Sequence, residues 1–84
     1  MLIYEARRRL ALIDAVLAKL EDVRLVSIDI DSSWNGRPRI CIVEPDWETF
    51  DERRRVDLSH VQYLRNIDGV SVVWYAKEPL PEGA

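Results

Sequence analysis

Apolar residues recur at three- and four-residue steps through the first quarter of the chain. The set is Ile3, Ala6, Leu10, Ile13, Leu17 and Leu20, with Val16 beside it. This spacing predicts an α-helix over roughly residues 3–20 with one broad buried stripe. Small residues (Ala11, Ala15 and Ala18) lie on the far side of this helix. They are good helix formers on a solvated face, or alternatively let a second helix approach and form a homodimer.

The pattern then changes to alternation, which predicts strands over residues 26–30 and roughly 37–44. A two-residue loop at Asn35-Gly36 would send the isoleucines of the two strands to opposite faces. A three-residue loop over residues 34–36 instead pairs Ile30 with Ile40 and Asp31 with Arg39, so we expect that register.

A second hairpin is indicated by Asp68-Gly69, which lies between two alternating apolar runs. Asp-Gly is a preferred pair for a two-residue type I′ turn, because both central positions need positive φ. This turn pairs Ile67 with Val70 and Tyr63 with Trp74, and it collects apolar side chains on one face. Residues 57–67 also fit a helical stripe that ends at Gly69, and this remains the alternative.

Between the hairpins, residues 45–55 predict a short helix, with Asp46 as its N-cap and with Trp47 and Phe50 one turn apart. The expected fold is therefore α+β. An N-terminal helix packs on a four-stranded antiparallel sheet made of two hairpins, with a short helix between strands 2 and 3. We expect one domain over residues 1–78 and a flexible tail over residues 79–84.

Composition narrows the function classes. The chain has 84 residues, a net charge of −3 and one cysteine, Cys41, so an internal disulfide is excluded. The acidic balance gives no electrostatic reason to expect general binding to nucleic acid or membranes. No long apolar run follows the N-terminal segment, and we expect a cytoplasmic protein.

The residues offer little catalytic chemistry, and we expect no enzyme and no cofactor. Asp29 and Asp31, with Glu44 on the next strand, have the oxygen ligands of a divalent-cation site, but Arg37 and Arg39 beside them favour a solvated, neutralised strand face. Asp57, Ser59 and His60 have the residue types of a hydrolase triad. They fall within four positions, too close in sequence to converge on one attacking oxygen.

The arginine triplets at residues 7–9 and 53–55 are the basis for a nucleic-acid alternative. Each triplet spreads around a helix instead of making one basic face. Were the two triplets adjacent in the fold, with Trp34 or Trp47 available for stacking, RNA binding would become credible.

The succession of residues 26–30, a turn, residues 37–42, Trp47 and Phe50, and then residues 67–70 resembles small phage and prophage proteins of unknown function that have a helix and two hairpins. The resemblance implies a small domain that binds a host or phage protein, as anti-CRISPR proteins do. It implies no catalytic residues.

Trp34 lies in a hairpin loop and is the best single binding candidate, because exposed tryptophan is enriched at interface hot spots. The expected partner-binding residues are Trp34, Asp29, Asp31, Arg37, Arg39, Glu48, Asp51 and Glu52. The last three belong to an acidic run that could meet a basic groove. The sequence therefore predicts a non-enzymatic protein-binding module that inhibits or modulates a host complex. The alternative is a small nucleic-acid-associated regulator.

Overall fold

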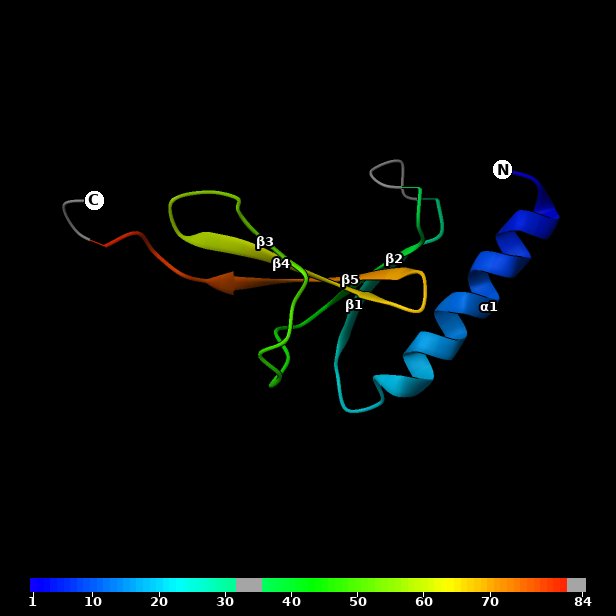
Figure 1. Ribbon diagram of the computed structural model, residues 1–84, viewed down its shortest axis with the longest axis horizontal. Helices are drawn as coiled ribbons and strands as arrows, with labels where there is room; N and C mark the ends of the chain where they lie inside the picture. The colour runs from blue at the N-terminus through cyan, green and yellow to red at the C-terminus, as the bar shows by residue number, and fades with distance from the viewer. Residues whose placement is uncertain (32–35, 82–84) are drawn as a thin grey trace.

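The computed structural model describes residues 1–31 and 36–81. In chain order, the elements are α1 (Ile3–Lys19), β1 (Leu25–Asp29), β2 (Arg39–Ile42), β3 (Glu52–Arg55), β4 (His60–Ile67) and β5 (Val70–Lys77). The strands form one sheet in the order β1-β2-β5-β4-β3, with α1 beside its β1 and β2 end (Figure 1). The α+β class is confirmed. The expected four antiparallel strands are wrong, because the sheet has five strands and β2 runs parallel to β5.

The β4–β5 hairpin has the register that its turn predicts. Ile67 pairs with Val70 and Tyr63 pairs with Trp74. Asp68 and Gly69 have φ angles of 48° and 84°, so both central residues occupy the left-handed region that a type I′ turn requires. The strand interpretation of residues 60–67 is therefore confirmed over the helical one.

The β1–β2 pairing is shifted by two residues from the expected register. Ile28 pairs with Ile40 and Asp29 pairs with Arg39, where the three-residue loop would have paired Ile30 with Ile40. An even shift keeps the isoleucines on one face, so the side-chain pattern alone could not distinguish the two registers. The parallel neighbour contributes a further constraint, because the backbone N–H of Ser71 donates to the carbonyl of Pro38 just before β2.

The short helix expected over residues 45–55 is absent from the described structure, and that prediction is wrong. The second half of this segment is β3, which pairs antiparallel with β4. The backbone N–H of Asp51 donates to the carbonyl of Leu64 at 2.8 Å, and the Asp51 carboxylate accepts the backbone N–H of Asn66 at 2.7 Å. Hydrogen bonds to an existing strand thus satisfy the backbone groups that a helix would have paired internally.

Trp47 and Phe50 lie in the loop before β3 and pack this loop onto the sheet. The Trp47 ring meets Trp74 edge-on at 5.6 Å between centroids, and Phe50 meets Tyr63 at 4.8 Å. Tyr63 and Trp74, paired across β4 and β5, stack at 5.7 Å. These four rings extend the core past the end of α1.

The core lies between α1 and the centre of the sheet. Its buried members are Ile13 and Val16 of α1 and Leu20 directly after the helix, together with Ile40, Ile42, Val70, Val72 and Trp74 of the sheet. Only part of the expected helical stripe is buried, since Ile3 and Leu10 are 81% and 46% exposed. Figure 1 shows that the first turns of α1 extend beyond the β4–β5 turn, away from the strands.

Candidate protein interface

The structure brings together some of the charged residues that the sequence singled out. Asp29 and Arg39 are cross-strand partners on the sheet face opposite α1, whereas Glu52 of β3 projects to the same face at the opposite edge of the sheet. The sequence predicted that Asp31 pairs with Arg39, and this prediction is wrong. Asp31 lies 3.8 Å from Arg9 of α1, and its backbone N–H donates to the Asp29 carboxylate at 3.1 Å. Arg37 is exposed in the turn before β2.

The acidic run does not form one surface. Glu48 lines a pocket of about 210 Å³ with Trp47, Phe50 and Tyr63, on the side of the sheet that α1 covers. Asp51 binds the backbone of β4, and Glu52 faces the other side. Trp34, the leading sequence candidate, lies outside the described residues, so its role stays a prediction.

The two arginine triplets lie far apart along the molecule (Figure 1). Arg9 contacts the carbonyl of Ile30 near the end of β1. The second triplet is in β3 at the opposite edge of the sheet. There the triplet alternates between faces, because Arg53 and Arg55 pair with Tyr63 and Val61 while Arg54 pairs with Gln62. This arrangement does not create the shared basic surface on which the nucleic-acid alternative depends.

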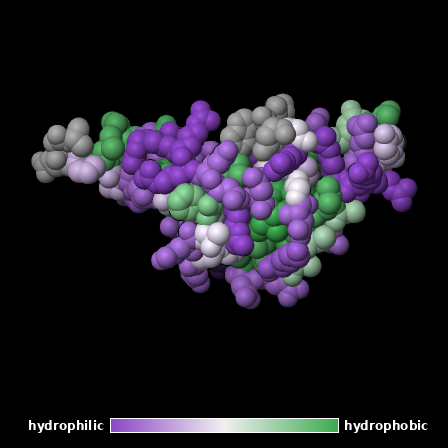
Figure 2. Space-filling model, in the orientation of Figure 1, coloured by the Kyte–Doolittle hydropathy of each residue, from purple (hydrophilic) through white to green (hydrophobic). Residues whose placement is uncertain are grey.

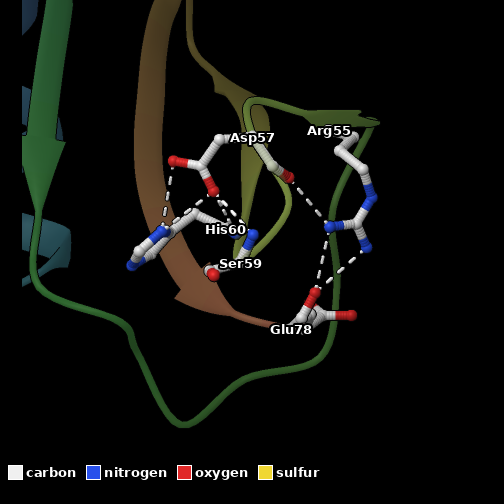
Figure 3. Close-up of polar contacts among 5 residues, drawn as sticks. All are labelled: Arg55, Asp57, Ser59, His60 and Glu78. Carbon is white, nitrogen blue, oxygen red and sulfur yellow. Dashed lines mark hydrogen bonds and ion pairs between the residues drawn. The ribbon is translucent and has the colours of Figure 1, made fainter. Parts of the chain in front are cut away.

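Asp57 and His60 meet at the turn that joins β3 to β4 (Figure 3). The Asp57 carboxylate accepts the backbone N–H groups of Ser59 and His60, each at 2.7 Å, and lies 3.1 Å from Nδ1 of the His60 ring. The hydrogen bond from Ser59 and the contacts with His60 lower the pKa of Asp57 below its usual value near 3.8. Asp57 therefore stabilises a tight turn, with Ser59 contributing its backbone N–H.

A second polar cluster joins the end of β5 to β3. The carboxylate of Glu78 accepts hydrogen bonds from the hydroxyl of Tyr63 and from Arg53, the latter at 3.2 Å. The Arg55 guanidinium donates to the carbonyls of Asp57 and Glu78 at 3.0 Å (Figure 3). The Tyr63 and Arg53 bonds lower the pKa of Glu78, and a hydrogen bond from Arg53 to the Tyr63 hydroxyl at 3.4 Å, together with the bond to Glu78, raises the pKa of Arg53. Arg53 and Arg55 of the second triplet thus hold β3 to the end of β5.

The described residues present no metal-binding group of three or more His, Cys, Asp or Glu side chains. Cys41 is a free, half-buried thiol on β2. None of the described helices has the length and hydropathy needed to cross a membrane.

A pocket of about 680 Å³ lies between the end of α1, the turn that follows it and the loop after β2. Charges of both signs line it, including Lys19, Arg24, Asp22 and Asp46. The Trp47 indole N–H is buried nearby without a hydrogen-bond partner among the described residues. The mixture of charges selects no class of ligand.

The two edges of the sheet differ in chemistry. β3 carries a glutamate and three arginines, which are residues that protect a strand edge from pairing with another chain. β1 carries Leu25, Val26 and Ile28, which are 48%, 61% and 41% exposed, and all five of its residues are exposed. A space-filling view shows an apolar area over β1 and the adjoining part of α1, bordered by hydrophilic residues (Figure 2).

Sequence reasoning missed this edge, because the alternation over residues 26–30 predicts a strand without saying whether an apolar face of that strand is covered. Alternation correctly indicates that β1 has an apolar side, but whether that side is covered depends on the strand order and on where α1 crosses. α1 packs over β2 and β5, and this leaves β1 uncovered by the helix. No local signal in residues 25–29 reports that placement.

Comparison with models of protein families, with curated proteins and with solved structures found no match to this chain.

Proposed function

We propose that this chain is a non-enzymatic protein-binding module whose interface is the exposed edge of β1 with the neighbouring surface of α1. The observation that supports this proposal is the apolar character of an unpaired sheet edge: Val26 is 61% exposed on a strand that pairs only with β2 among the described residues. Exposed apolar patches rimmed by polar groups are typical of protein-binding sites.

The mode of binding that suits this edge is strand addition. A partner strand laid along β1 would satisfy its outward backbone N–H and C=O groups, while Leu25 and Ile28 would supply apolar contacts. Asp29 and Arg39, exposed or half-buried on the adjoining face, would add charge selectivity at the rim.

Inhibition or modulation of a host complex, in a cytoplasmic setting, is a narrower form of this proposal. It derives from the resemblance to small phage proteins, and the single cysteine is compatible with it because no internal disulfide is needed. The separated arginine triplets favour a protein partner over nucleic acid.

The test is affinity capture by the purified protein, with nuclease treatment throughout and with lysate of the natural host as the source of partners. Val26→Lys places a charge in the apolar edge and should abolish capture of any partner that uses β1. Leu58→Lys is the matched control, because Leu58 is 73% exposed on the β3–β4 turn, far from β1.

A discrete protein that survives nuclease, is lost with Val26→Lys and is kept with Leu58→Lys supports the proposal. Capture that vanishes on nuclease treatment, or that is equally strong with both variants, contradicts it. Trp34→Ala belongs in the same series, since it tests the binding role that the sequence predicts for that residue.

A further inference from the structure

We propose that the partner of β1 is a second copy of this chain, so that two sheets join edge to edge in a reversible homodimer. This inference rests on the proposed function, because it assigns a partner to the same edge. It differs from dimerisation through the alanines of α1, which leaves β1 free.

The strand's charge order is self-complementary. Arg24 precedes β1, Asp29 ends it and Asp31 follows, so the strand is basic at its start and acidic at its end. Antiparallel pairing of two identical strands brings Arg24 of each copy towards Asp29 of the other, whereas parallel pairing would align like charges. Charges of opposite sign across an antiparallel pair are stabilising.

The symmetry is also compatible with the rest of the fold. Two identical antiparallel edges meet about a two-fold axis perpendicular to the sheet, and this operation keeps each face on its own side. The two α1 helices would then lie on the same side of one continuous sheet of ten strands. The opposite edges of that sheet would be the two β3 strands, whose charged side chains oppose further addition. Assembly would therefore stop at the dimer.

The size of the edge sets the strength of the association. β1 has five residues, and the pairing with β2 is irregular between Leu25 and Ser27. A seam of this length buries less area than a permanent dimer does, so we expect a weak, concentration-dependent dimer. It should be detectable by sedimentation velocity between about 10 μM and about 1 mM protein.

The decisive experiment exchanges charges between copies. Arg24→Glu alone places two acids opposite each other, and Asp29→Lys alone places two bases opposite each other, so each variant should self-associate about tenfold more weakly than the parent chain. An equimolar mixture of the two variants restores opposite charges across the seam, and it should form a heterodimer of parental strength. Recovery in the mixture also demonstrates that both variants are folded.

Two control variants separate this interface from other surfaces. Arg54→Glu alters the β3 edge and Ala15→Glu alters the exposed alanine face of α1, and both should dimerise as the parent chain does. A parent chain that stays monomeric overturns the inference. So does a mixture without recovery, or a dimer that Ala15→Glu disrupts.

Failure of this inference is distinguishable from failure of the proposed function. A monomeric chain whose lysate partner is lost with Val26→Lys refutes the homodimer and keeps β1 as an interface. A chain in which β1 variants change neither self-association nor capture refutes both.

Discussion

Gly69→Ala tests whether the turn chemistry sets the conformation of the β4–β5 hairpin. Gly69 has φ +84°, and a Cβ placed there meets no other atom within 4 Å. The cost of the substitution is therefore backbone strain alone, because an L-residue in the left-handed region loses about 1–2 kcal/mol. In a domain of this size, 1 kcal/mol lowers the melting temperature by about 4–8 °C. We expect a decrease of roughly 5–15 °C.

The assay is thermal unfolding followed by circular dichroism, with Gly69→Asn as the matched variant. Asparagine tolerates positive φ better than alanine does, since its short polar side chain bonds locally, so Gly69→Asn should recover much of the lost stability. An unchanged melting temperature for Gly69→Ala would refute the type I′ turn. An asparagine variant as unstable as the alanine variant would show that strain at φ is not the cause.

Three further predictions concern the core, the loop and the carboxylates. Val16 is fully buried, so Val16→Ala should lower the protein's free energy of unfolding by about 2 kcal/mol. Val26→Ala on the exposed edge should lower it by less than about 0.5 kcal/mol, and urea denaturation measures both changes. Trp47→Phe removes a buried N–H that has no partner but keeps a ring against Trp74, so it should cost less than about 1 kcal/mol, against about 3 kcal/mol or more for Trp47→Ala in the same assay. Glu78 has a folded pKa below its usual value near 4.5, so its stabilising contribution is present above that value and is lost as the pH falls through the folded pKa. The urea concentration at the unfolding midpoint should therefore be lower at pH values below 4.5 than at neutral pH, and this decrease should be smaller in Glu78→Gln. An equal decrease in both proteins would contradict the role given to the Tyr63 and Arg53 contacts.

The candidate interface shows where reasoning from the sequence stops. The sequence placed Asp31 opposite Arg39, whereas the structure pairs Arg39 with Asp29, two residues away. The exposure of Val26 and Ile28 was not visible, because an apolar strand face looks the same whether a helix covers it or not.

The segment of residues 45–55 shows a second limit. Its N-cap and its aromatic spacing both favour a helix locally, yet residues 52–55 form a strand. A short isolated helix is marginal in water, whereas pairing with β4 satisfies the backbone of both strands. Tertiary contact therefore overrides a local preference of small magnitude.

Features that depend on neighbours along the chain could be predicted from the order of residues alone. Asp68-Gly69 selects a turn through its own φ angles, and the register of β4 with β5 follows residue by residue. The spacing of apolar residues from Ile3 onward likewise specifies α1, since helical hydrogen bonds span only four residues.

The order of the strands and the position of α1 depend instead on contacts between segments that are distant in the sequence. β5 is buried along most of its length, so it needs neighbours on both sides, and it pairs with β4 and, in parallel, with β2. That choice moves β1 and β3 to the edges, and it leaves the apolar strand exposed at one edge and the charged strand at the other. Such pairings join residues far apart in the sequence, so the burial of the whole core, and not the pattern of any one segment, selects them.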